Sequence, residues 1–74
     1  MKKAIYSPAQ NKVVERLILA RKEAKLTQKE VALHLSFTQS FISKIESGQR
    51  KIDVILLKQL ADLYNKKVDY FLTK

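Results

Sequence analysis

Only one glycine, Gly48, and one proline, Pro8, interrupt the 74 residues of this chain. Tight hairpin turns depend on such residues at defined positions, and no stretch alternates polar and apolar residues as a half-buried strand does. The apolar residues recur instead at helical spacing. The sequence therefore predicts an all-α fold with short connections between its helices.

The expected helices begin at capping residues, which are Ser7 (ahead of Pro8), Thr27, Thr38 and Asp53. Thr27 and Glu30 together form the pattern of a capping box. Asn65 is a suitable left-handed residue at which to end the fourth helix. A last short helix is expected at about 69–72. We expect residues 1–6 to form a flexible arm and residues 7–74 to form one domain.

The sequence lacks the residues that several classes of function require. There is no cysteine, which removes disulfides, thiolate catalysis and zinc-finger sites, and His34 is the only histidine. No cluster of acid, base and nucleophile is apparent, so we expect neither an enzyme nor a metal or other cofactor. The absence of a long apolar run or a signal peptide predicts a cytoplasmic protein that does not enter a membrane.

The charge favours a polyanionic partner. Fifteen Lys and Arg residues against seven Asp and Glu give a net charge of +8. Nucleic acid is the first candidate and an anionic membrane the second. Many small proteins are basic without binding either, so charge alone leaves the partner open.

Two short expected helices, 28–35 and 39–47, are joined by only three residues. Such a short connection forces the helices to cross steeply, as in a helix-turn-helix. The second helix has one side of short hydrogen-bonding side chains and a single cation, namely Gln39, Ser40, Ser43, Lys44 and Ser47. Glutamine can read an adenine edge, and lysine can reach guanine or phosphate. An ordinary solvated helix face is the alternative.

The segments LTQKEVALHLSFTQSFISKIESGQRKID and LLKQLADLYNKKVDYFL resemble the Cro/repressor-type (XRE) helix-turn-helix family, over about residues 12–72. The resemblance implies a compact five-helix, lambda-repressor-like DNA-binding domain. It implies base contacts from Gln39, Ser40, Ser43 and Lys44. It implies phosphate contacts from Gln28, Thr38, Ser47, Arg50 and Lys51, although plain loop charge is the alternative for Arg50 and Lys51. It also implies a structural ion pair between Arg21 and Glu46.

Two positions depart from the family pattern. Ser36 stands in the turn where the family usually has a left-handed glycine, which predicts a slightly strained turn or a different geometry. Lys67 stands where a capping serine or aspartate is usual, so the last helix is expected to be weakly anchored.

The fourth helix is more apolar than a single buried side requires. We expect Leu57, Leu60, Ala61 and Tyr64 to face the core, and Ile55, Leu56 and Leu63, with Tyr70, to form a homodimer interface. In the alternative, the last helix covers these residues within one chain.

The sequence therefore predicts a regulator of transcription, a repressor, that binds a two-fold related site on double-stranded DNA as a homodimer. The rival interpretation is an antitoxin or another protein-interaction module. There the fourth helix and the C-terminus would bind a protein partner, and DNA binding would serve autoregulation.

Overall fold

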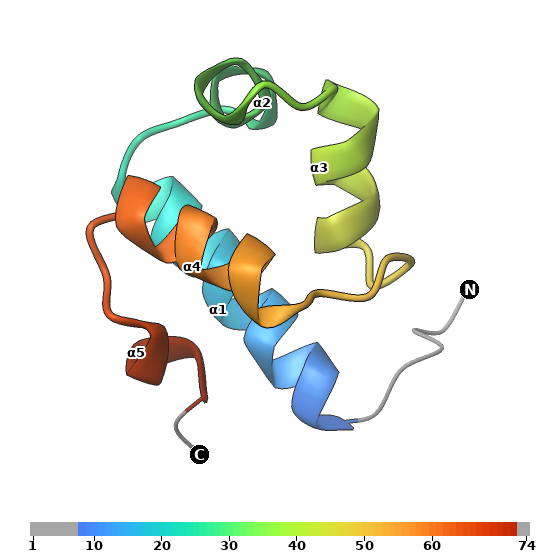
Figure 1. The fold of residues 1–74 in the computed structure, drawn as a ribbon, viewed down its shortest axis with the longest axis vertical. Coiled ribbons are helices and arrows are strands. Elements are labelled where there is room, and N and C mark those ends of the chain that lie inside the picture. The colour runs from blue at the N-terminus through green and yellow to red at the C-terminus, as the bar shows by residue number, and fades with distance from the viewer. Residues whose placement is uncertain (1–7, 73–74) are drawn as a thin grey trace.

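The computed structural model describes residues 8–72, which form five helices and no strand (Figure 1). The helices are α1 (Pro8–Glu23), α2 (Gln28–Leu35), α3 (Gln39–Glu46), α4 (Val54–Leu63) and α5 (Val68–Leu72). The predicted all-α fold with a helix-turn-helix is confirmed. The expected arm at 1–6 and the cap at Ser7 lie outside the described residues.

Three of the four predicted N-caps lie within the described residues, and all three are confirmed. The Thr27 hydroxyl accepts a hydrogen bond from the Glu30 amide, and the Glu30 carboxylate accepts one from the Thr27 amide at 2.8 Å, which completes a capping box. The side chains of Thr38 and Asp53 each accept from the amide three residues further on. These local bonds fix where α2, α3 and α4 begin.

Three helices end at a residue in the left-handed region, and none of these residues is glycine. Lys25, Ser36 and Asn65 all have a φ of 61°. The predicted left-handed stop at Asn65 is thereby confirmed, as is the left-handed turn at Ser36. Asparagine adopts this conformation with little cost, whereas the Cβ atoms of lysine and serine are strained there.

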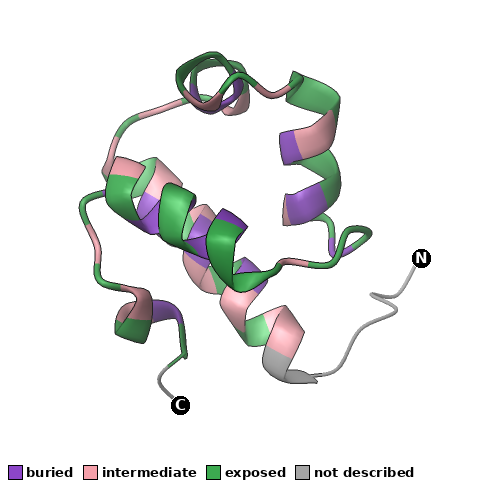
Figure 2. Cartoon of the chain, in the orientation of Figure 1, coloured by how far each residue is buried: buried purple, intermediate pink, exposed green. Residues whose placement is uncertain are grey.

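All five helices contribute to a single core. Its buried members are Leu17, Ala20, Val31, Ala32, Ile42, Ile45, Leu56, Leu57, Leu60, Ala61, Tyr64 and Phe71. Helix α1 packs against α3 and α5, α2 packs against α3, and α4 packs against α5. Figure 2 shows that α3 turns its buried positions toward the middle of the molecule and its exposed positions outward. Two helices, α1 and α2, therefore hold α3 in place.

The end of the described chain is anchored to α1. Phe71 is completely buried. The Arg16 guanidinium donates a hydrogen bond of 2.6 Å to the Tyr70 carbonyl, and Arg16 and Lys66 both lie over the Tyr70 ring. The weak anchoring expected from the missing cap at Lys67 is therefore offset by a buried ring and by a cation that donates to a carbonyl of the last helix.

The exposed apolar side of α4 contains fewer residues than the sequence predicted. Leu56 is a core residue with 8% of its surface exposed, so its placement on a free side of the helix is wrong. At about 100° per residue it lies only about 40° from Leu60, inside the buried arc. Leu63 is partly buried against the core. Ile55, at 70% exposure, remains on the surface.

Candidate nucleic-acid interface

The turn between α2 and α3 fixes the angle at which the two helices meet. Ser36 ends α2 in the left-handed conformation, and the Phe37 amide donates to the Ala32 carbonyl at 2.9 Å. Thr38 then begins α3. Figure 1 shows α2 nearly end-on and α3 side-on, so the two helices cross steeply. The three-residue connection thus produces the predicted geometry.

Helix α3 has one buried side and one exposed polar side. Ile42 and Ile45 are each 1% exposed and attach the helix to the core. The predicted base-contacting residues are all exposed and lie within about 140° of helix circumference, namely Gln39, Ser40, Ser43 and Lys44. The structure therefore brings these four residues together on a surface that we call the α3 polar face.

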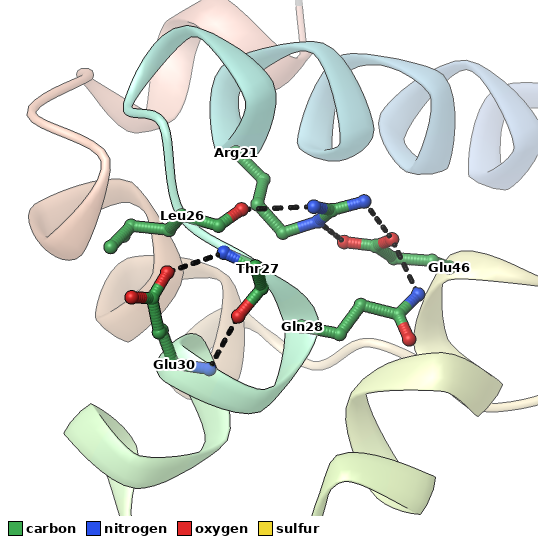
Figure 3. Close-up of polar contacts among 6 residues, drawn as sticks. All are labelled: Arg21, Leu26, Thr27, Gln28, Glu30 and Glu46. Carbon is green, nitrogen blue, oxygen red and sulfur yellow. Dashed lines mark hydrogen bonds and ion pairs between the residues drawn. The ribbon is translucent and has the colours of Figure 1, made fainter.

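A network of hydrogen bonds to charged side chains holds the C-terminal end of α3 in place (Figure 3). The predicted Arg21–Glu46 pair is present, with Arg21 Nε 2.7 Å and Nη2 3.1 Å from the two carboxylate oxygens of Glu46. Arg21 Nη1 also donates to the Leu26 carbonyl at 2.9 Å. Gln28 Nε2 donates to Glu46 at 3.0 Å. This network ties α3 to α1 and to the first residue of α2.

The side chains of the ion pair are largely removed from water, with 13% of Arg21 and 7% of Glu46 exposed. The hydrogen bond to Glu46 raises the pKa of Arg21 despite the opposing effect of burial. Burial, followed by the charge of Glu46, raises the pKa of the nearby Tyr64 phenol. The guanidinium therefore keeps its charge, and Glu46 has a cationic partner at a helix end where the dipole alone disfavours an anion.

Gln28 was predicted to contact phosphate through its side chain or its amide, and its side-chain NH2 is bonded to Glu46. Within the described residues the amides of Gln28 and Lys29 have no acceptor, since the Thr27 cap takes the Glu30 amide. The N-terminus of α3 is similar, because Thr38 takes the Phe41 amide. Free amides at a helix N-terminus are donors for anions such as phosphate.

The loop after α3 carries the remaining predicted residues. Gly48 adopts a φ of 79°, which turns the chain away from the helix. The Ser47 hydroxyl is used within the chain, since it donates to the Lys44 carbonyl at 3.2 Å and accepts from Gln49 at 2.8 Å. Arg50 and Lys51 are exposed.

One contact of this loop was absent from the sequence analysis. The Arg50 guanidinium lies over the ring of Phe41, 4.7 Å from its centre. The nine-residue separation crosses the end of α3 and the turn at Gly48, and no local sequence pattern indicates a contact of this kind.

Two other kinds of feature are absent from the part of the chain that the structure describes. No group of three or more histidine, cysteine or acidic side chains that could hold a metal occurs between residues 8 and 72. None of the helices in that range is long and apolar enough to cross a membrane.

Two short helices crossing steeply at a three-residue turn, with the second fixed by its neighbours and polar on its outer side, define a helix-turn-helix domain. A family model described as helix-turn-helix matches residues 17–71 of the chain. The chain belongs to this helix-turn-helix family, in its XRE-type branch.

One relative is an HTH-type transcriptional regulator, ImmR, of Bacillus subtilis (strain 168), which is 40% identical to the chain over 60 residues. The matched region covers 81% of this chain and 47% of ImmR. The chain therefore spans about half the length of the curated relative that it matches.

Proposed function

We propose that the chain is a sequence-specific transcriptional repressor that binds a two-fold related operator as a homodimer. The observation that carries this proposal is the α3 polar face. It is exposed along its length and is carried by a helix that α1, α2 and the Arg21–Glu46 pair hold in one orientation. Repression then follows from occupancy, because a bound protein blocks the access of polymerase to the same DNA.

In this proposal α3 lies in the major groove and its polar face meets the base edges. Gln39, at the start of the helix, can pair its amide with an adenine. Lys44, two residues before the helix ends, can reach guanine acceptors or a phosphate. The serines at 40 and 43 are short, which lets the helix approach the groove closely.

Phosphate contacts flank this face. We assign them to Lys51 and Arg50 in the loop after α3, and to the hydroxyl of Thr38. A contact from Ser47 requires its hydroxyl to exchange the hydrogen bond to the Lys44 carbonyl for one to phosphate. At the start of α2 we assign the contact to the backbone amide of Gln28, since its side chain is engaged with Glu46. The net charge of +8 supports the same partner.

A second copy is needed for the proposed specificity. Successive major grooves on one side of the duplex are about 34 Å apart, and the described part of the chain extends 27 Å along its longest axis. One copy therefore reaches one groove. We place the dimer contact at the start of α4, where Val54 and Ile55 are 69% and 70% exposed. Leu63 extends this surface in part, whereas Leu56 is used by the core.

Ile55→Glu tests the dimer, since it places a charge on the proposed contact without entering the core. We expect a folded protein that sediments as a monomer and binds a two-half-site duplex more weakly, with unchanged affinity for a single half-site. Equal affinities of variant and wild type for the full site would contradict this assignment. Leu63→Glu is less suitable, because Leu63 packs partly against the core.

The phosphate assignment is tested by salt titration of DNA binding. Lys51→Ala removes one proposed contact, so the slope of log K against log salt should flatten by about 0.9. Lys67→Ala removes the same charge from the connection between α4 and α5, on the side of the molecule away from α3 in Figure 1, and should leave the slope unchanged. Equal changes in the two variants would show that only total charge matters.

The rival function, an antitoxin or other protein-interaction module, has less support. It would use the apolar side of α4 together with the C-terminal segment to bind a partner. Val54 and Ile55 of α4 are exposed, so the rival is weakened at the C-terminal segment. Phe71 is fully buried, and the Tyr70 ring is covered by Arg16 and Lys66 of its own chain.

A further inference from the structure

The contact between Arg50 and Phe41 belongs to a row of three side chains that runs outward from the core. Phe37 is partly buried against the core, its ring lies 4.6 Å from that of Phe41, and the Arg50 guanidinium lies 4.7 Å from the Phe41 ring centre. No described residue forms a hydrogen bond or ion pair with Arg50. Among the described residues, the Phe41 ring is therefore the contact that orders this exposed cation.

We propose that Phe41 is a positioning residue that holds the Arg50 guanidinium ready for a DNA phosphate before DNA binds. This inference rests on the proposed function, because it requires a duplex as the ligand. In this role Phe41 acts neither as a core residue nor as a contact to a base.

The position of Phe41 on α3 suits this role. At about 100° per residue it lies between the buried side, marked by Ile45, and the polar face, whose nearest member is Lys44. Phe41 and Lys44 are three residues apart and thus neighbours on the helix surface. A guanidinium stacked on this ring is placed beside the Lys44 edge of the polar face, where the phosphate backbone would flank a helix in the groove.

The chemistry of the stack leaves Arg50 free to bind. The ring contacts the face of the planar guanidinium, whereas its five N–H donors point outward in the plane. These donors can therefore form a two-pronged contact with phosphate oxygens while the stack persists. Ordering a long side chain in advance lowers the entropy that binding must remove. A lysine at this position keeps the charge but has no planar group that can stack on the ring.

The proposal is tested by a double-mutant cycle with Phe41→Leu and Arg50→Lys in the full chain, on a random-sequence 20-base-pair duplex. Leucine keeps an apolar contact and removes the ring face, and lysine keeps the charge and removes the stack. We expect each single change to weaken binding about two- to fivefold, the range for an exposed cation–π contact. The double variant should be no weaker than the weaker single variant.

Lys51→Ala serves as the control, since Lys51 has no ring contact among the described residues and should weaken binding by the same factor with or without Phe41→Leu. Losses from Phe41→Leu and Arg50→Lys that simply multiply would overturn the proposal, as would a Phe41→Leu variant that binds like the wild type. If Phe41→Leu fails to fold, Arg50→Lys and Arg50→Ala decide instead. Arg50→Lys should lose most of the DNA affinity that Arg50→Ala loses. An Arg50→Lys variant with wild-type affinity would overturn the proposal.

A measurement on the free protein separates this inference from the proposed function. The Arg50 side-chain protons should show an upfield ring-current shift in the NMR spectrum, which Phe41→Leu abolishes. If neither the wild type nor any variant binds a duplex while this shift is present, the proposed DNA-binding function fails. Phe41 then holds Arg50 in place, but there is no phosphate for Arg50 to bind. If the shift is absent from the wild type, the stack does not exist, and the inference fails whatever the protein does with DNA.

Discussion

Glu46→Gln is the substitution whose consequence the structure specifies most fully. The Glu46 carboxylate accepts three hydrogen bonds, two from Arg21 and one from Gln28, and is 7% exposed. Glutamine has nearly the same shape, but one of its two terminal atoms is a donor. That NH2 group must face another donor, and the Arg21 charge loses its partner in a site that is 13% exposed.

The expected cost follows from this geometry. Removing one member of a buried ion pair destabilises a protein by about 3–5 kcal/mol. The Arg21–Glu46 pair lies at the margin of the core and keeps some exposure, which favours the lower end, about 3 kcal/mol. A domain of this length has a total stability of about 4–11 kcal/mol. We therefore expect Glu46→Gln to remove about a quarter or more of the free energy of unfolding.

Urea denaturation followed by far-UV circular dichroism measures this loss. Glu30→Gln is the matched control, because Glu30 also accepts a hydrogen bond but is exposed, and glutamine serves equally well in a capping box. It should change stability by less than about 0.5 kcal/mol. Equal effects at the two positions would refute our account of α3 as a helix fixed by a buried ion pair.

Four further substitutions have defined expectations. Ser36→Gly should raise stability by about 0.5–1 kcal/mol, since φ at this residue is 61°, and a lower urea midpoint would contradict the strain at this turn. Lys25→Gly should behave alike, whereas Asn65→Gly should gain less because asparagine tolerates this conformation. Burial raises the pKa of the Tyr64 phenol above 10, its value in the unfolded chain. The contribution of this phenol to the free energy of unfolding is therefore complete below pH 10 and is lost as the pH rises above that value. Between pH 8 and pH 11 the wild type should lose up to about 1.4 kcal/mol more than Tyr64→Phe, and equal losses would show that this phenol ionises freely.

The sequence was sufficient for features that depend on neighbouring residues. The capping box at Thr27 and Glu30 and the left-handed stop at Asn65 form from groups within three residues of each other, so local chemistry specifies them. The Arg21–Glu46 pair spans 25 residues. It could be predicted because the family resemblance supplied the tertiary contact that the spacing alone does not.

The sequence was insufficient for side chains whose surroundings are set by distant elements. Leu56 was assigned to an interface, but the buried arc of α4 extends far enough around the helix to include it. The surroundings of Tyr70 depend on how α5 docks on α1, which Arg16 and the burial of Phe71 determine. The Gln28 amide group has a choice of partners, and only the folded position of Glu46 decides between them.

The binding of Gln39→Ala to two duplexes decides whether the α3 polar face reads bases. One is the duplex that the wild type selects from a random pool, and the other is unselected DNA of equal length. If the face reads bases, Gln39→Ala should lose about 1–3 kcal/mol of binding free energy on the selected site, show a relaxed preference at one base pair, and bind unselected DNA with nearly unchanged affinity. An equal loss on both duplexes, or no loss on either, would contradict base reading by this face.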